Sequence, residues 1–269
     1  MIASRPDPTG PEAATTARRI LLVGIDGVRL DRLRDASTPH LDALTAEGFL
    51  TSATIPPVNR TMSGAMWSTI LTGVWADRHG VRYNWWPSRR LVRFPDVLQQ
   101  VTRAEGDVFA AVSWAPIGMR AGCGPILRTP SFVPERRLTT LRSWERADDA
   151  VTAHAVERLA DPAIRAGFVC LGQADMAAHF HGAAERYRAG IEACDALLRK
   201  LVDAVHARAD ADEWTILVTT DHGHRDAGGH GTRTEAETTV WFAGDRRLPG
   251  WDELDSSKVA EYVVAATRG

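Results

Sequence analysis

Five short apolar runs recur along the chain, and each is bounded by polar or turn-forming residues. Runs of this length without strict alternation are typical of strands that are buried on both faces. The segments between them carry helical periodicity or helix-capping residues. The predicted strands are 19–26, 107–114, 166–175, 213–221 and 237–244, and the predicted helices are 37–48, 63–73, 146–159, 183–209 and 256–267.

This alternation predicts an α/β fold, with a mostly parallel central sheet and helices on both faces. A length of 269 residues suits a single domain of this kind, which we place at 19–269. Residues 1–18 are rich in Pro, Ala and Thr and predict a disordered N-terminal tail. The stretch 87–143 is rich in Arg and Pro and is the least regular part, so we expect it to cover the site or to form a wall that decides specificity.

The overall composition narrows the classes of partner. A formal net charge of -2 disfavours a nucleic-acid polymer, because binding one requires a basic face. No apolar run approaches the length of a membrane span, and the first residues lack the apolar core of a secretory signal. Three cysteines form no disulfide framework, and Cys170 and Cys194 predict buried free thiols. We therefore expect a cytoplasmic protein, while the oligomeric state stays open.

Three predicted strands end in an aspartate: Asp26, Asp175 and Asp221. Each acid alone could simply cap a following turn or helix. In open α/β sheets, however, ligands bind beyond the carboxyl ends of the strands. Three carboxylates gathered at that edge would repel one another, so their convergence predicts a cation between them.

Histidines accompany these aspartates. His179 follows Asp175 by four residues, a spacing that places both side chains on one face of a helix. His222 follows Asp221 directly, and His230 lies between glycines, where the backbone can approach closely and aim the ring. Carboxylate and imidazole ligands together suit zinc, manganese or iron better than calcium.

A hydroxyl group near these ligands is the candidate nucleophile. Ser63 precedes a predicted helix, and a helix N-terminus favours an anion. The same serine could be an ordinary helix cap, and Thr61 is a competing hydroxyl. Beside a metal ion, either hydroxyl could be deprotonated near neutral pH and act as a nucleophile.

Six segments occur in an order and register that resemble the alkaline phosphatase superfamily, type I phosphodiesterase/nucleotide pyrophosphatase branch. They are "ILLVGIDGVR", "STPHLDAL", "MSGAMWSTILTG…HGVRYN", "ADMAAHFHG", "TTDHGH" and "GGHG", between residue 20 and about residue 244. The resemblance implies an alkaline-phosphatase-like fold. His230 follows His222 at a separation of only eight residues, where members with long insertions separate these motifs widely, so we expect no large cap domain.

The resemblance also implies a set of site residues. Two divalent metal ions are expected, most often zinc, with manganese as the other candidate. One would be held by Asp175, His179 and His230. The other would be held by Asp26, Asp221, His222 and the nucleophile. The family nucleophile lies nine residues before the Thr of a "TG" pair, here Thr72, which selects Ser63 over Thr61, and Asn84 matches the position that binds a phosphoryl oxygen.

Two positions depart from the branch. Its phosphodiesterases commonly use Thr as the nucleophile, whereas this chain has Ser63. Nucleotide-cleaving members often place an aromatic residue directly after the nucleophile, and here that position is Gly64. Trp85 and Trp86 could stack a base instead, or could simply line the wall, so the departure leaves nucleotide specificity open.

The expected function is hydrolysis of a phosphate diester or pyrophosphate bond in a small phosphorylated molecule, possibly a nucleotide, through a phosphoseryl intermediate. The alternative is a phosphomonoesterase or phosphonate hydrolase on the same scaffold. A sulfatase is disfavoured because Ser63 stands where a modified cysteine would be required, and a non-catalytic metal-binding scaffold is disfavoured because the full ligand set is present. His181 and His224 could donate protons, could orient the metal ligands, or could be surface residues. Arg120, Arg128, Arg136 and Arg137 either meet a second anionic group or are solvated.

Overall fold

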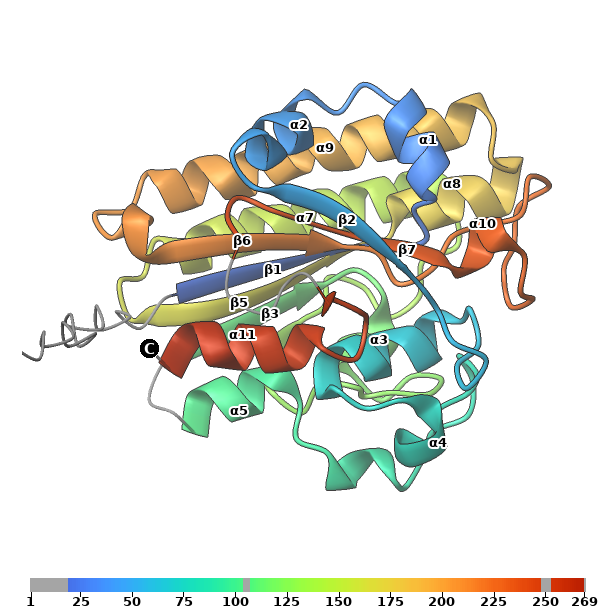
Figure 1. The fold of residues 1–269 in the computed structure, drawn as a ribbon, viewed down its shortest axis with the longest axis horizontal. Helices are drawn as coiled ribbons and strands as arrows, with labels where there is room; N and C mark the ends of the chain where they lie inside the picture. Colours follow the sequence, from blue (N-terminus) through green and yellow to red (C-terminus); the bar gives the residue numbers. More distant parts are fainter. Residues whose placement is uncertain (1–18, 104–106, 248–252, 269) are drawn as a thin grey trace, which may run out of the picture.

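The computed structural model describes residues 19–103, 107–247 and 253–268. The predicted tail at 1–18 lies outside this part of the chain. A seven-stranded sheet runs through the centre, in the order β2-β7-β6-β1-β5-β3-β4 (Figure 1). The strands are β1 (Arg19–Ile25), β2 (Phe49–Thr54), β3 (Asp107–Val112), β4 (Ser131–Phe132), β5 (Ile164–Leu171), β6 (Trp214–Thr219) and β7 (Thr239–Gly244).

The sheet is mostly parallel, which confirms the predicted fold class. β1 pairs in parallel with β5 and β6, and β3 pairs in parallel with β5 and β4. Only β7 is reversed, because it runs antiparallel to both β6 and β2. The sequence did not predict β2. As an edge strand it exposes alternate side chains, so it never forms a continuous apolar run.

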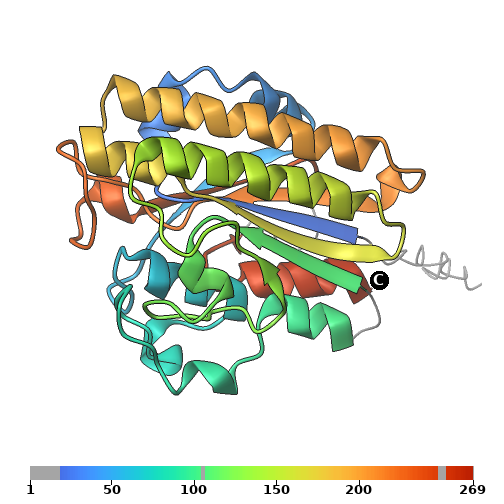
Figure 2. The ribbon, with the colours of Figure 1, turned by 180° about the vertical axis from the view of Figure 1, so that it is seen from behind.

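Helices cover both faces of the sheet, and Figures 1 and 2 show the two layers from opposite sides. One layer, the α9 layer, contains α1 (Leu30–Asp35), α2 (Pro39–Ala46), α7 (Leu141–Leu159), α8 (Gln173–His181) and α9 (Glu185–His206). The other, the α3 layer, contains α3 (Ser63–Thr72), α4 (Ala76–His79), α5 (Val97–Arg103), α6 (Ala115–Gly118) and α11 (Val259–Arg268). The remaining short elements are η1 (Leu91–Arg93), η2 (Ala211–Glu213) and α10 (Glu235–Thr238).

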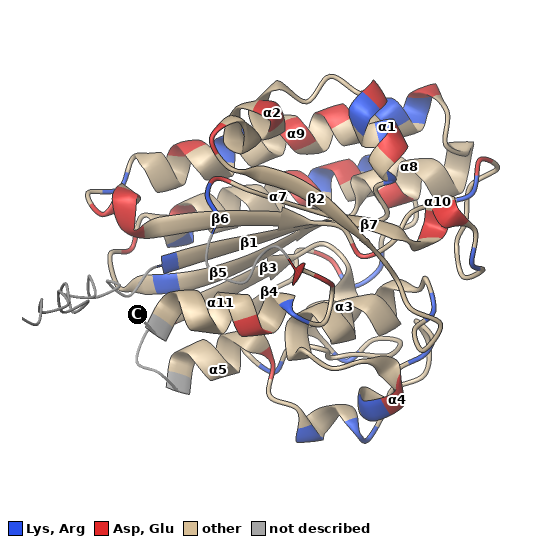
Figure 3. Ribbon diagram, in the orientation of Figure 1, with Lys and Arg blue, Asp and Glu red and all other residues tan. Residues whose placement is uncertain are grey.

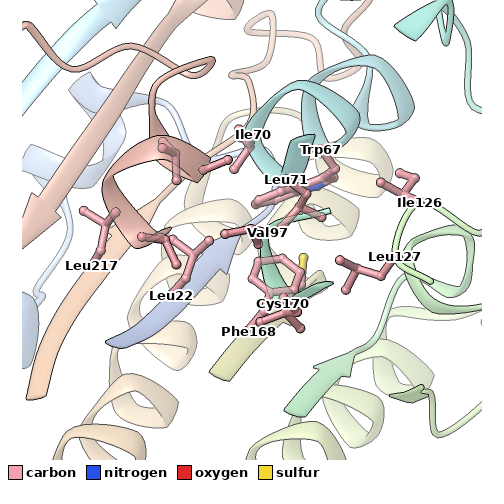
Figure 4. Packing of buried hydrophobic residues seen from close by; sticks show 14 of the residues in the cluster. Leu22, Trp67, Ile70, Leu71, Val97, Ile126, Leu127, Phe168, Cys170 and Leu217 are labelled. Atoms are coloured by element: carbon pink, nitrogen blue, oxygen red, sulfur yellow. The ribbon is translucent and has the colours of Figure 1, made fainter. Parts of the chain in front are cut away.

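Two hydrophobic clusters join the layers to the sheet. Alternate residues of β1 face opposite sides: Ile20 and Leu22 pack into the α3 layer, while Leu21 and Val23 pack into the α9 layer. Figure 4 shows residues of the first cluster, in which the rings of Trp67 of α3 and Phe168 of β5 lie 5.8 Å apart between centroids. This two-sided burial explains why the central strands are continuous apolar runs in the sequence.

One predicted strand end was wrong. The run 166–175 was expected to be a strand that ends in Asp175, but β5 ends at Leu171 and Asp175 lies in the first turn of α8. The buried carboxylate of Asp148 accepts hydrogen bonds from the backbone N–H groups of Gly172 and Gln173. The chain therefore turns from strand to helix within one residue, and Asp175 reaches the site from a helix.

The polypeptide that the structure describes contains no helix that is both long and apolar enough to cross a membrane. Its three cysteines, Cys123, Cys170 and Cys194, are buried and unpaired.

Candidate metal centre and nucleophile

The predicted site residues meet at the edge where β1 and β6 end and α3 and α8 begin (Figure 1). Asp26 follows β1 directly, and Asp221 and His222 follow β6. Their ligand atoms lie within 4.8 Å of one another, and all three side chains are buried. We call Asp26, Asp221 and His222 the buried group.

Fixed hydrogen bonds orient the two carboxylates of the buried group. The indole N–H of Trp67 donates to Asp26 Oδ2 at 2.9 Å, and the backbone N–H of Gly27 donates to Asp221 Oδ1 at 3.0 Å. Trp67 can reach this position because it packs on Gly24, where a Cβ atom would stand 2.3 Å from the indole ring. The other two oxygens, Asp26 Oδ1 and Asp221 Oδ2, are buried and have no hydrogen-bond partner among the described residues.

The imidazole of His222 completes this arrangement. Its Nδ1–H donates to the Gly223 carbonyl at 3.1 Å, so the Nε2 lone pair faces the carboxylates. Nε2 lies 3.3 Å from Asp221 Oδ2 and 3.8 Å from Asp26 Oδ1. Three atoms with free lone pairs therefore converge: Asp26 Oδ1, Asp221 Oδ2 and His222 Nε2. Two carboxylate oxygens and an imidazole nitrogen form a ligand set that suits a divalent cation.

Burial dominates the electrostatics of this group. It raises the pKa of Asp26 well above its ordinary value, and the neighbouring Asp221 and Asp175 raise it further. Burial also raises the pKa of Asp221 to about 8. The pKa of His222 is lowered by burial, so its ring is neutral at physiological pH, the form that binds metals. A bound cation would reverse the cost of ionising the two aspartates.

Asp175, His179 and His230 form a second set with ligand atoms within 4.8 Å of one another, which we call the outer group. His179 Nε2 lies 3.5 Å from Asp175 Oδ2, across one turn of α8. The Nδ1–H of His230 donates to the Thr61 carbonyl at 2.6 Å, so its Nε2 faces His179 Nε2 at 3.1 Å. Two ring nitrogens facing each other at this distance suit a shared cation.

The loop that carries His230 is tied to the segment before the nucleophile. Gly231 has a φ of +107°, a left-handed conformation that favours glycine. Its N–H donates to Thr61 Oγ1 at 2.9 Å, and that hydroxyl donates to the Thr232 carbonyl at 2.9 Å. The fully buried Glu237 accepts from the Thr232 N–H at 2.9 Å. Thr61 is thus fully buried and engaged in holding the loop.

Ser63 occupies the first turn of α3 and is the hydroxyl nearest the ligands. Its Oγ lies 3.2 Å from His222 Nε2. The next residue, Gly64, donates its N–H to Asn84 Oδ1 at 2.8 Å. This bond fixes the amide of Asn84 with its NH₂ donors left for another acceptor. Asn84, rather than the Gly64 N–H, is therefore the donor available to a phosphoryl oxygen.

His224 is a site residue that the sequence left undecided. It is fully buried, and its Nε2–H donates to Asp175 Oδ1 at 2.7 Å. Burial alone would raise the pKa of Asp175, but the hydrogen bond and charge of His224 lower it below its ordinary range. His224 also joins Asp175 and His222 in a third potential ligand set. The spacing of His222 and His224 was the available signal, since residues two apart in extended chain point the same way. His181, by contrast, is exposed and belongs to none of the three sets.

Comparison with known proteins identifies the family of this chain. A family model described as type I phosphodiesterase/nucleotide pyrophosphatase matches residues 20–263. The chain is 32% identical to ectonucleotide pyrophosphatase/phosphodiesterase family member 7 of Rattus norvegicus over 87 aligned residues. The aligned residues make up 32% of this chain and 20% of the rat protein.

Solved structures share the fold. Murine ectonucleotide pyrophosphatase/phosphodiesterase 5 aligns with a TM-score of 0.57 and 20% identity, over 77% of this chain and 57% of that one. The phosphonate monoester hydrolase of Agrobacterium radiobacter aligns with a TM-score of 0.64 and 16% identity, over 85% of this chain and 68% of that one. This chain thus spans little more than half of the murine structure and a fifth of the rat protein. The family match covers most of the chain, and the protein belongs to the type I phosphodiesterase/nucleotide pyrophosphatase family.

Proposed function

We propose that the protein hydrolyses phosphate diester or pyrophosphate bonds of a small molecule, using two divalent metal ions and Ser63 as the nucleophile. The observation that carries this proposal is the position of Ser63 Oγ, 3.2 Å from His222 Nε2, beside two carboxylate–imidazole groups. The buried group together with Ser63 Oγ would hold one ion, and the outer group would hold the other. Zinc and manganese suit these ligands.

When bound, the ions would lower the pKa of the Ser63 hydroxyl and neutralise charge that develops on the attacking and leaving oxygens. The chain's own residues set the geometry. Ser63 Oγ would form a bond to phosphorus while the bond to the leaving oxygen, opposite it, breaks and the leaving oxygen takes up a proton. The Asn84 amide would donate to a non-bridging phosphoryl oxygen. Water would then cleave the phosphoseryl ester and return the proton to Ser63.

His224 has a positioning role in this proposal. Its hydrogen bond fixes one oxygen of Asp175 and leaves Oδ2 turned toward His179. Supporting hydrogen bonds of this kind orient metal ligands and raise their affinity.

The organic groups esterified to the phosphate, which we call the ester arms, define the substrate more closely. Murine ectonucleotide pyrophosphatase/phosphodiesterase 5 has been crystallised in its inactive form with AMP, which makes nucleotides one class to test. In this chain the position after the nucleophile is Gly64, while Trp85 and Trp86 beside Asn84 are 58% and 67% exposed. These tryptophans are accessible to an aromatic group of a substrate.

The test is hydrolysis of bis(p-nitrophenyl) phosphate against p-nitrophenyl phosphate by protein stripped of metal and then given zinc or manganese. We expect metal-dependent turnover with a preference for the diester. A preference for the monoester would favour the phosphomonoesterase or phosphonate hydrolase alternative.

Ser63→Ala should lose turnover by about 10³-fold or more, because it removes the nucleophile itself, while bound metal persists. Ser52→Ala, an exposed serine on β2, is the matched control and should keep full activity. Full turnover in Ser63→Ala would contradict the proposed nucleophile.

A further inference from the structure

A cavity of about 650 Å³ lies in the α3 layer. Its walls come from residues 87–92, which include the start of η1, and from 120–128, with Arg136 at the rim. Leu91, Cys123 and Ile126 of this lining belong to the hydrophobic cluster that also contains α3. The cavity is therefore built into the same layer as Ser63, on the opposite side of the sheet from α8.

Direct contacts join the cavity wall to Gly64 and Asn84, which lie next to Ser63. The Cys123 N–H donates to the Asn84 carbonyl at 2.8 Å. A Cβ atom placed on Gly64 would stand 2.7 Å from Cys123 Sγ, so the wall touches the residue that follows Ser63. Cys123 thus stands between the cavity and the residues next to Ser63, namely Gly64 and Asn84.

The charged residues that line the cavity are all arginines. Three of the lining residues are Arg120, Arg128 and Arg136. The Arg128 guanidinium donates to the carbonyls of Val92 and Phe94 at 2.8 and 2.9 Å, and Arg136 donates to the Arg120 carbonyl at 2.9 Å. In the described part of the chain, no carboxylate lies within ion-pair distance of these three guanidinium groups.

The surrounding segment has the same sign. Between Arg78 and Arg137 the sequence contains ten arginines and four acidic residues, whereas the whole chain has a net charge of -2. In Figure 3, the blue segments around α4 contrast with the mixed red and blue of α1 and α9. Asp96, a buried acid in this segment, accepts from the backbone N–H of Arg128 at 2.9 Å rather than from its side chain. Positive charge without paired carboxylates draws anionic ligands.

Apart from Ser88, the other side chains of the lining are apolar. Leu91, Val92 and Ile126 face the cavity together with Pro87 and Pro125. A pocket that combines an apolar floor with guanidinium groups fits a short aliphatic or aromatic chain that ends in a carboxylate or phosphate.

The geometry also distinguishes the two arms of a diester. In an in-line displacement the leaving oxygen stands opposite the attacking Ser63 Oγ. The cavity lies on the side of Ser63 and Asn84, whereas the outer group on α8 and the His230 loop lies across the site. The arm that remains on phosphorus is held at Ser63 after the attack, next to the Cys123 wall of the cavity, whereas the leaving arm departs on the opposite side.

We propose that this cavity binds an anionic group on the retained ester arm, and thereby selects diesters that carry a second negative charge a few bonds from the scissile phosphate. This inference rests on the proposed phosphodiesterase function and names the substrate class of the same site.

The test compares two diesters with the same leaving group: p-nitrophenyl 3-carboxypropyl phosphate and p-nitrophenyl butyl phosphate. We expect the carboxylate to raise kcat/KM about tenfold, the effect of one charge-assisted hydrogen bond. The double variant Arg120→Ala/Arg136→Ala should lose this preference while turning over the butyl ester at the wild-type rate. Arg137→Ala, an exposed arginine next to Arg136 but outside the lining, is the matched control.

A binding measurement separates the two hypotheses. Calorimetric titration of the metal-loaded wild type with the retained products, 3-carboxypropyl phosphate and butyl phosphate, requires no turnover. If neither diester is cleaved but the carboxylate product binds more tightly in an arginine-dependent way, the cavity assignment stands and the hydrolase proposal fails. Equal turnover and equal product binding would overturn the cavity assignment alone, as would a preference that survives in the double variant. Loss of both turnover and differential binding would overturn both.

Discussion

Asp26, Asp221 and His222 of the buried group are enclosed by the protein, whereas His179 of the outer group is exposed. The enclosed residues follow two central strands directly, and their carboxylates are fixed by a buried indole and a backbone amide. The outer residues come from a helix and from a loop that depends on left-handed glycines. The buried group is thus part of the sheet's own framework, while the outer group is an assembly that can loosen without unfolding the core.

The largest expected effect is on the buried group. Asp221→Asn keeps the shape but removes the charge of a ligand, and we expect turnover to fall by more than about 100-fold, beyond the range seen for residues that only support a ligand. Metal analysis should show one ion lost. Asp245→Asn is the control, because Asp245 is a mostly buried acid that accepts from Ile216 at the other end of β6. Two ions retained in Asp221→Asn would remove this residue from the ligand set.

His179→Ala tests the outer group. Because the two remaining outer ligands and the buried group stay in place, we expect the metal concentration for half-maximal activity to rise by about 100-fold, with activity recovered in excess zinc or manganese. His181→Ala, an exposed histidine at the end of the same helix, should leave this requirement unchanged. An equal effect of the two substitutions would show that the imidazole at 179 has no special role.

Asp148 links the fold to the outer group, because it caps α8 through Gly172 and Gln173. Burial raises the pKa of Asp148 to about 6. The folded protein therefore holds this proton more tightly than the unfolded chain, so the contribution of Asp148 to stability is greatest in acid and is lost as pH rises toward 6. Between about pH 4.5 and 7, metal-free wild type should lose about 2 kcal/mol relative to Asp148→Asn. Urea unfolding measures this difference, and parallel pH curves for the two proteins would exclude it.

Glu237→Gln should produce the smallest effect. The carboxylate accepts from the N–H groups of Thr232 and Thr234 and from the Thr234 hydroxyl, and a glutamine amide can replace only part of these bonds. We expect the free energy of unfolding to fall by about 1.5 kcal/mol. We also expect a higher metal concentration to be required to fill the outer group, with no change for the buried group. Glu235→Gln, an exposed acid on the same helix α10, should change neither. If Glu237→Gln lost as much metal from the buried group as from the outer group, the two groups would not bind metal independently.

The parts of the site that the sequence predicted are those that follow continuous apolar runs. Asp26 comes directly after β1, and Asp221 and His222 follow β6 within three residues, so buried central strands leave an unambiguous pattern. The helix that starts at Ser63 was predicted at its observed position, and the structure shows that Gly73 ends it in a left-handed conformation. The four-residue spacing of Asp175 and His179 also indicated a helix, although the apolar run before it concealed where β5 ends.

Other features depend on contacts between distant segments and leave little trace in one chain. The engagement of Thr61 with the His230 loop joins residues about 170 positions apart, so the sequence left Thr61 as a competing hydroxyl until a family resemblance decided against it. The edge strand β2 escaped prediction because polar residues such as Ser52 and Thr54 interrupt its apolar ones, so it forms no continuous apolar run. The contact between Cys123 and Gly64 arises from packing of the irregular stretch 87–143, for which no periodicity exists to guide a prediction.

The crowding at Gly64 constrains how this scaffold could acquire new specificity. A Cβ atom there would lie 2.7 Å from Cys123 Sγ, 3.0 Å from the Tyr83 carbonyl and 3.2 Å from Asn84 Oδ1. An aromatic side chain at this position cannot be grafted as a single substitution without displacing the segment around Cys123. Redesign toward base recognition would have to exchange the two segments together, whereas changes at the arginine-lined rim are open to stepwise variation.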